Sequence, residues 1–147
     1  MSQAEELAKA ARFGLGGRGY AGSTRWAGYA TKKMPDLLAQ SQDETVVIAQ
    51  IEEPAAVEIA DSIARIEGID GLFAGPADLS VGMGYKNQDS NELKAALKKV
   101  GVAAKENGKG YASFIGDADQ AKSWAEDYGV NMFSVSYTHL RAHETAS

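Results

Sequence analysis

Two hydrophobic periods alternate along this chain and divide it into short and long elements. Short apolar runs, rich in β-branched residues and bounded by turn residues, predict four strands at 45–51, 69–75, 110–115 and 130–135. Apolar residues at helical spacing predict helices between them at 54–67, 91–107 and 117–129. Because strand and helix alternate through short connections, we expect an α/β fold with a parallel sheet, either doubly wound or a barrel.

The N-terminal part of the chain has a different pattern. Residues 3–12 predict an amphipathic helix, and the glycine-rich segment 13–23 predicts a loop. A second helix is expected from the Ser-Thr pair after this loop to about Gln40. Pro35 stands inside that span and should kink or restart the helix.

Composition narrows the class of protein without indicating an activity. The 147 residues, 44% of them apolar, suit one soluble domain with a core, which we place at 1–134. The chain has no cysteine, which excludes disulfides, thiolate zinc sites and cysteine nucleophiles. A net charge of −5 argues against nucleic acid as a partner. No apolar stretch is long enough to span a membrane and no signal peptide is visible, so we expect a cytoplasmic location.

Two carboxylates stand at the carboxyl ends of neighbouring predicted strands, where parallel α/β folds bind ligands. Alternation of side chains puts Gln50 and Glu52 on one face of the first strand, and Asp78 follows the second strand in "AGPADLS". Glu53 belongs to the start of the following helix, and Asp78 could likewise cap a short helix. As a pair, Glu52 and Asp78 are hard oxygen ligands one βα unit apart, which suits Mg²⁺ or Mn²⁺.

The same segments carry a resemblance to a known family. The stretch "VIAQIEEPAAVE", followed by "IDGLFAGPADLSVGMG", resembles the HpcH/HpaI aldolase/citrate lyase family of metal-dependent 2-oxo acid aldolases. The upstream "RFGLGGRGYAGSTRWAGY" and the downstream "YASFIGDADQAKSWAEDYGVNMFSV" are similar to neighbouring segments of that family. The resemblance covers about residues 3–134, nearly the whole chain.

The resemblance implies a (β/α)₈ TIM barrel, of which this chain supplies the C-terminal half. It implies a reversible cleavage of a 4-hydroxy-2-oxo acid into pyruvate and an aldehyde. Glu52 and Asp78 would hold the divalent metal, Mg²⁺ or Mn²⁺ with Co²⁺ also possible. Gln50 would hydrogen-bond the 2-oxo acid, and the backbone N–H groups of Ala77 and Asp78 would receive its carboxylate. Full-length members commonly form hexamers, so a homo-oligomer is expected for a full-length parent.

This chain lacks part of what such an enzyme needs. In the family, a histidine base and an arginine that neutralises enolate charge come from the first half of the barrel, and no segment here matches them. We therefore expect a metal and pyruvate half-site that is inactive alone. The alternatives are an acyl-CoA lyase like the citrate lyase beta subunit, or a non-catalytic metal-binding barrel fragment. A third, nucleotide binding through "GLGGRG", is disfavoured because a helix precedes these glycines where the dinucleotide fingerprint requires a strand.

The last segment, "VSYTHLRAHETAS" (135–147), holds both histidines, His139 and His143. Their i, i+4 spacing on a helix would present a zinc pair. The segment resembles no part of the aldolase family and is similar to a translated sequencing adapter. We therefore expect 135–147 to be a non-native tail that contributes nothing to the fold or to metal binding.

Overall fold

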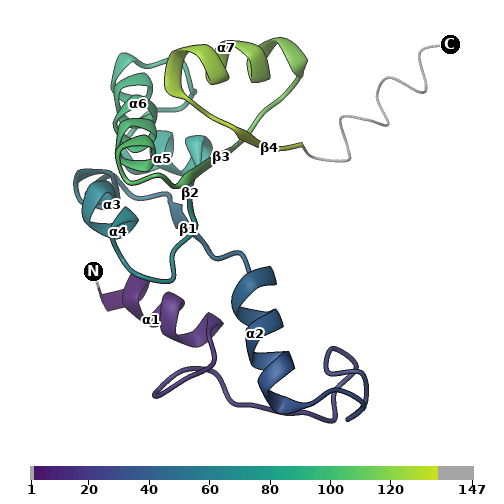
Figure 1. Ribbon diagram of the computed structural model, residues 1–147. Coiled ribbons are helices and arrows are strands. Elements are labelled where there is room, and N and C mark those ends of the chain that lie inside the picture. The colour runs from purple at the N-terminus through teal and green to yellow at the C-terminus, as the bar shows by residue number, and fades with distance from the viewer. Residues whose placement is uncertain (1, 136–147) are drawn as a thin grey trace, which may run out of the picture.

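The computed structural model describes residues 2–135, so all but the first residue of the predicted tail, including His139 and His143, lies outside the described part. Figure 1 shows the elements in chain order: α1 (Ser2–Ala11), α2 (Met34–Glu44), β1 (Ile48–Ile51), α3 (Pro54–Glu58), α4 (Ala60–Ala64), β2 (Gly71–Ala74), α5 (Pro76–Gly82), α6 (Asn91–Glu106), β3 (Gly110–Phe114), α7 (Ala118–Tyr128) and β4 (Met132–Ser134). Within these residues no helix has the length and apolar character needed to cross a membrane.

The four strands form one parallel sheet in the order β1-β2-β3-β4. Each strand pairs with the next along the chain, and Figure 1 shows α3, α4, α6 and α7 along one side of the strands. A doubly wound sheet reverses its strand order and carries helices on both faces, whereas continuous winding is that of a (β/α) barrel. The predicted α/β class is confirmed, and of its two alternatives the barrel is correct.

Side chains of the strands point alternately toward these helices and toward an inner face. Six residues of β1 to β3 on the helix side are buried: Ala49, Ile51, Leu72, Ala74, Tyr111 and Ser113. Helix α6 packs on β2 and β3 and against α4 and α7. The Tyr111 hydroxyl donates to the Leu97 carbonyl of α6 at 2.9 Å. Burial raises the pKa of Tyr111, so the phenol remains a hydrogen-bond donor.

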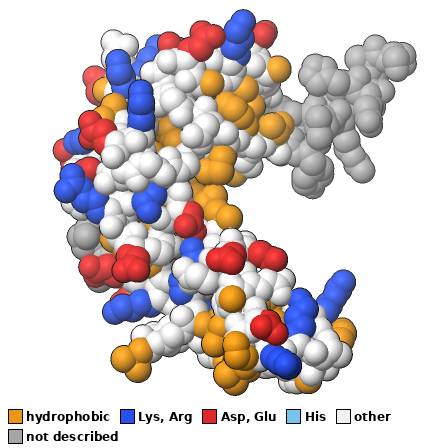
Figure 2. Space-filling view, viewed as in Figure 1, with side chains coloured by type: hydrophobic (Ala, Val, Ile, Leu, Met, Phe, Trp, Pro, Cys, Tyr) orange, Lys and Arg blue, Asp and Glu red, His pale blue; other side chains and the backbone are white. Residues whose placement is uncertain are grey.

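The inner face of the sheet is only partly covered. Gln50, Phe73, Ala112 and Met132 are Cα partners and form one row across it. The Met132 side chain folds over two glycines, because a Cβ at Gly71 or Gly110 would lie 3.3 or 2.5 Å from its Cε. Figure 2 shows hydrophobic side chains along this hollow side of the molecule. The face that the sequence analysis assigned to Gln50 and Glu52 is therefore an open barrel interior.

The helix predicted from the Ser-Thr pair to Gln40 is wrong in its first half. Residues 22–32 form turns and bends, and α2 begins only at Met34, with Pro35 in its first turn. Gly28, Tyr29 and Ala30 have φ angles of 62°, 53° and 68°, a left-handed region that an α-helix does not include. Pro35 thus starts a helix, where its missing N–H removes no helical hydrogen bond.

Two further boundaries differ from the prediction. The helix expected at 54–67 is divided into α3 and α4, because Ile59 has φ −110° and ψ 15° and interrupts the helical geometry. The segment after β2, for which the periodicity predicts neither a helix nor a strand, begins with the short helix α5, which has Pro76 in its first turn. The predicted helices at 91–107 and 117–129 are confirmed as α6 and α7. Ser90 and Asp117 cap them by accepting from Leu93 N and Gln120 N.

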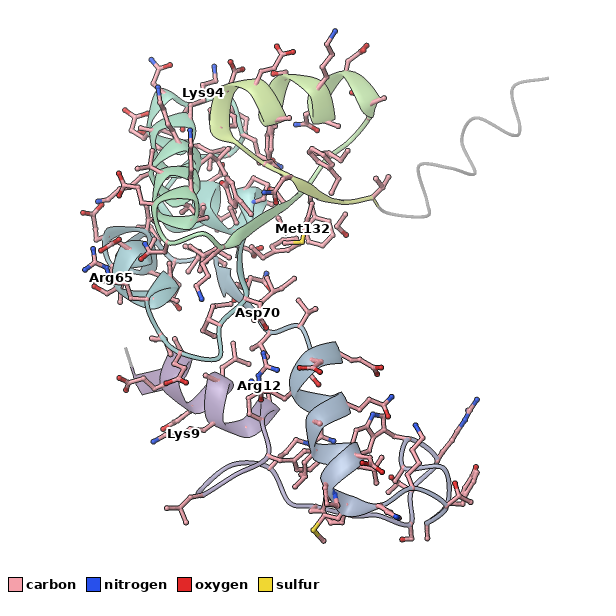
Figure 3. The ribbon with its side chains drawn as sticks, viewed as in Figure 1. Lys9, Arg12, Arg65, Asp70, Lys94 and Met132 are labelled. Carbon is pink, nitrogen blue, oxygen red and sulfur yellow. The ribbon has the colours of Figure 1, made fainter. Side chains whose placement is uncertain are left out.

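A carboxylate fixes the N-terminal helix to the amino end of the sheet. Asp70 Oδ2 accepts hydrogen bonds from Val47 N and from Arg12 Nη2, each at 2.7 Å. Arg12 Nη1 also donates to the Gln42 carbonyl at 3.0 Å. Figure 3 shows Arg12 and Asp70 pointing toward one another between α1 and the sheet. The Arg12 side chain is only 15% exposed, so water screens this ion pair less than a surface pair.

We expect Asp70→Ala to lower the free energy of unfolding by about 2–3 kcal/mol, because it leaves the Val47 amide and a largely buried guanidinium without their acceptor. Urea denaturation followed by circular dichroism measures the loss. The matched control is Glu58→Ala, which removes the more exposed 2.6 Å ion pair to Lys99 and should cost about 0.5 kcal/mol or less. Equal losses for the two variants would contradict the assignment of Asp70 as a structural anchor.

Candidate functional site at the carboxyl ends of β1 and β2

The parallel register brings the ends of β1 and β2 to the same level. Ile51 and Ala74 are Cα partners, and Gly75 N continues the ladder by donating to the Ile51 carbonyl at 3.0 Å. Glu52 and Gly75 therefore leave the sheet side by side. Asp78 follows within the first turn of α5 and is carried back toward the strand ends. The register thus places the two predicted carboxylates at one edge of the sheet.

Gly75 is the position around which the predicted site residues converge. A Cβ built on it would lie 3.2 Å from Glu52 Cβ, 3.4 Å from Asp78 Oδ2 and 3.6 Å from Gln50 Nε2. Its φ of −94° and ψ of 90° are open to other residues, so the requirement for glycine here is one of space. The absence of a side chain leaves a small cradle walled by an amide and two acidic residues.

The polar groups of this cradle are exposed and only partly engaged. Gln50 Nε2 donates to Glu52 Oε2 at 2.8 Å, and both side chains are exposed. Within residues 2–135, no salt bridge reaches Glu52 or Asp78, and no third acidic or imidazole group joins them. Two hard carboxylates in contact with water could provide part of the oxygen ligand set of a hydrated divalent ion. The remaining ligands would have to be water or substrate.

Helix α5 presents backbone amides beside these carboxylates. Leu79 N donates to the Gly75 carbonyl at 2.9 Å, which leaves the amides of Ala77 and Asp78 among the first-turn donors that have no acceptor within the helix. Gly75 is the N-cap residue of α5 and has no side chain. Glu53 is the N-cap residue of α3, and its side chain makes no capping hydrogen bond. The alternative that Asp78 caps a short helix is therefore wrong, since Asp78 lies inside the first turn of α5.

A cleft of about 470 Å³ adjoins Asp78 on the side of β3. It is lined by the Gly75–Asp78 turn together with residues that the sequence analysis did not select: Gln88, Phe114, Ile115, Gly116 and Gln120. Gln120 Oε1 accepts from Gly116 N at 2.5 Å, and the Phe114 ring packs edge-on against Phe73 with centroids 4.9 Å apart. Phe114 had a usable signal, because it lies near the carboxyl end of the predicted strand 110–115, which follows the strand that ends at Gly75. Gln88 and Gln120 had none.

The glycine loop is not part of this site. Residues 12–33 connect α1 to α2, and the four glycines of "GLGGRG" follow a helix, as the sequence indicated. Arg18 lies in that loop with its Cζ 4.5 Å from the centroid of the Phe13 ring. This contact holds the arginine on the loop's own aromatic side chains. The dinucleotide alternative has no strand–turn–helix to support it.

A continuously wound parallel sheet with acidic groups at the carboxyl ends of its strands defines half of a (β/α) barrel of the enzyme type. The sequence model of the HpcH/HpaI aldolase/citrate lyase family matches residues 1–139. The chain therefore belongs to the HpcH/HpaI aldolase/citrate lyase family, which confirms the resemblance found in the sequence.

Individual relatives agree with this assignment. Over 130 residues the chain is 35% identical to a 4-hydroxy-2-oxo-heptane-1,7-dioate aldolase of Escherichia coli, a match that covers 84% of this chain and 48% of the relative. It is 34% identical over 140 residues to a hydroxypyruvate/pyruvate aldolase of Delftia acidovorans, with 90% and 49% covered. A family protein from Burkholderia cenocepacia superposes with a TM-score of 0.87 at 28% identity, over 99% of this chain and 59% of that one. The chain thus spans about half the length of the curated relatives it matches.

We expect Gly75→Ala to weaken the binding of Mn²⁺ by about tenfold or more, because its methyl group would press on Glu52 and Asp78 and move the carboxylates apart. Titration followed by the electron paramagnetic resonance of free Mn²⁺ measures the affinity. Gly116→Ala is the matched control, since its Cβ would meet only Gln120 Oε1, at 3.4 Å. An unchanged affinity in Gly75→Ala, in a variant with a native circular dichroism spectrum, would remove Gly75 from the site.

Proposed function

We propose that this chain carries the metal and pyruvate half-site of a divalent-metal-dependent aldolase, which reversibly cleaves a 4-hydroxy-2-oxo acid into pyruvate and an aldehyde. The observation that carries the proposal is the convergence of Gln50, Glu52 and Asp78 around the space above Gly75. Two relatives with aldolase names support the reaction class. Those relatives are about twice as long, so the activity belongs to a protein larger than the described barrel half.

The donor set fits a hard divalent cation. Glu52 and Asp78 supply carboxylate oxygens from two different elements, and the whole chain has no cysteine thiolate to favour a softer metal. Both side chains are exposed, which leaves room for water and substrate oxygens in the remaining positions. Mg²⁺ or Mn²⁺ suits this arrangement best, with Co²⁺ as a further candidate. When bound, such an ion supplies positive charge that stabilises the enolate of pyruvate.

The neighbouring polar groups would hold the substrate. Gln50 Nε2 donates to Glu52 Oε2, and it would also donate to an oxygen of the 2-oxo acid at the same edge. The amides of Ala77 and Asp78, at the positive end of α5, would receive the substrate carboxylate. Asp78 would therefore act twice, through its side chain on the cation and through its backbone on pyruvate. The aldehyde portion would lie in the adjoining cleft, beside Phe114 and Gln120.

The described residues contain no histidine that could transfer the proton. The only two histidines of the chain, His139 and His143, lie in the predicted tail, and no arginine reaches the carboxylates through an ion pair within residues 2–135. An aldolase needs a base to take the proton of the 4-hydroxyl group and a cation near the developing enolate. We propose that both come from the part of the barrel that this chain lacks. The chain alone should then bind pyruvate without turning over substrate.

The half-site is tested by binding. With Mn²⁺ present, we expect the chain to bind pyruvate, with the paramagnetic broadening of the pyruvate methyl proton resonance as the signal. Glu52→Gln and Asp78→Asn should each weaken Mn²⁺ binding by about tenfold or more and abolish the broadening, because each removes one anionic ligand. Glu53→Gln, at the N-cap of α3, is the control and should behave as the parent chain. A chain that ends at Ser134 should bind Mn²⁺ with unchanged affinity, because we expect the tail histidines to have no role in metal binding.

The incompleteness of the half-site is tested by turnover. We expect no pyruvate release from a 4-hydroxy-2-oxo acid by this chain with Mg²⁺, Mn²⁺ or Co²⁺, followed by coupling to lactate dehydrogenase. A control reaction with added pyruvate shows that the coupling works under each metal. Release that persists in EDTA would contradict the metal-dependent reaction, and release that needs the metal would contradict the expected lack of a base. Cleavage of an acyl-CoA thioester in place of the 2-oxo acid would favour the citrate lyase alternative.

A further inference from the structure

The end of α6 carries the residue pair that is most susceptible to deamidation. Asn107 is the only asparagine of the chain that precedes a glycine, Gly108. In such a pair the backbone nitrogen of the glycine attacks the side-chain carbonyl carbon of the asparagine, because glycine has no side chain to hinder the approach. The nitrogen loses its proton as the new C–N bond forms, and the side-chain amide leaves as ammonia. Water then opens the resulting succinimide to aspartate or isoaspartate, so the reaction needs no enzyme or cofactor.

The helix end holds the nucleophile of this reaction. Gly108 has a φ of 64°, and its N–H donates to the Lys105 carbonyl at 3.1 Å. Lys109 N donates to the Ala104 carbonyl at 2.9 Å. Together these bonds form the Schellman motif, in which a left-handed glycine ends a helix. The glycine that the motif requires is therefore the residue that makes Asn107 reactive, and its N–H is engaged by a carbonyl.

The side chain of Asn107 is held as well. Its Nδ2 donates to Asp61 Oδ1 at 2.9 Å and to the Ala103 carbonyl, one turn earlier in α6, at 2.8 Å. Asp61 lies on α4, which packs against α6 (Figure 1). The hydrogen bond from Asn107, and after it the charge of Arg65, lowers the pKa of Asp61, so the acceptor is a carboxylate at neutral pH. Rotation of the asparagine toward Gly108 N thus breaks a charge-assisted hydrogen bond.

We propose that Asn107 is a deamidation site held in check by Asp61, and that its deamidation loosens the contact between α4 and α6. Both reacting groups must leave their hydrogen bonds before the succinimide forms, so the reaction follows local opening of the end of α6. The aspartate product replaces Nδ2 by a carboxylate oxygen beside Asp61 Oδ1, where two donated hydrogen bonds are lost and like charges repel. This inference is independent of the proposed metal chemistry.

The rate of deamidation tests the check by Asp61. Peptide mapping by mass spectrometry, on chains incubated at slightly alkaline pH, measures the conversion of Asn107 with time. We expect the folded chain to react more slowly than the chain unfolded in guanidinium chloride, by about tenfold or more. Asp61→Ala should raise the rate of the folded chain by about tenfold, because it removes one charge-assisted hydrogen bond. Arg65→Ala is the matched control, since it removes the 3.0 Å ion pair of Asp61 and leaves the bond to Asn107, and its rate should equal that of the parent.

Three outcomes of this experiment would overturn the check, once circular dichroism has shown the variants folded. The first is an equal rate for the folded and the unfolded parent chain. The second is an Asp61→Ala chain that reacts no faster than the parent. The third is an equal acceleration by Arg65→Ala, which would attribute the effect to α4 as a whole and not to the hydrogen bond.

The stability of a product mimic tests the consequence of deamidation. Asn107→Asp should melt at a lower temperature than Asn107→Ala, because alanine loses the same hydrogen bonds without placing a charge beside Asp61. In an Asp61→Ala background the difference between the two variants should shrink, which completes a double-mutant cycle. Differential scanning calorimetry measures each Tm. A folded Asn107→Asp chain that melts no lower than Asn107→Ala, or an unchanged difference in the Asp61→Ala background, would overturn the proposed loosening of α4 and α6.

Discussion

Ile51 and Ala74 are Cα partners in the parallel ladder between β1 and β2, and Gly75 N extends the ladder by one more hydrogen bond. This register sets the level at which Glu52 and Gly75 leave the sheet, and Gly75 has no side chain to separate its neighbours. A shift of one residue would turn Gln50 and Glu52 toward the buried helix side, because strand side chains alternate with a period of two. The position of the candidate site therefore depends first on the register of β1 and β2, and only then on which acidic residues stand there.

Two aspartates at opposite ends of β2 show how the fold divides stability from chemistry. Asp70, before the strand, is paired with Arg12 and the Val47 amide, whereas Asp78, after it, has no ion pair among the described residues. A carboxylate next to a cation is electrostatically satisfied, but two exposed carboxylates that face a common space repel one another until a cation arrives. In α/β barrels the amino ends of the strands serve stability and the carboxyl ends bind ligands. Asp70 follows the first part of this rule, and we propose that Asp78 follows the second.

The sequence was sufficient for the parts of the fold that depend on local pattern. The alternation along residues 45–51 correctly separates Ala49 and Ile51, which are buried, from Gln50, which is exposed. It was insufficient where a backbone conformation has no compositional signal. Tyr29 and Ala30 adopt positive φ although neither is glycine. Because their residue types give no sign of this conformation, the apolar pattern before Pro35 was interpreted as a helix. The cleft beside Asp78 also required three-dimensional information, because Gln120 reaches it from a helix more than forty residues away in sequence (120 − 78 = 42).

The inner face of the sheet is covered at its amino end and open at its carboxyl end, where the candidate site lies. Toward the amino end, Met132 covers Gly71 and Gly110 from within the chain. Toward the carboxyl end, Phe114 remains 49% exposed and lines the same cleft as Asp78. Any surface that buries this ring must lie within reach of the acidic cradle. A segment that buries the apolar inner face would therefore also complete the candidate site. The polar groups on that segment would decide which chemistry the two carboxylates can support.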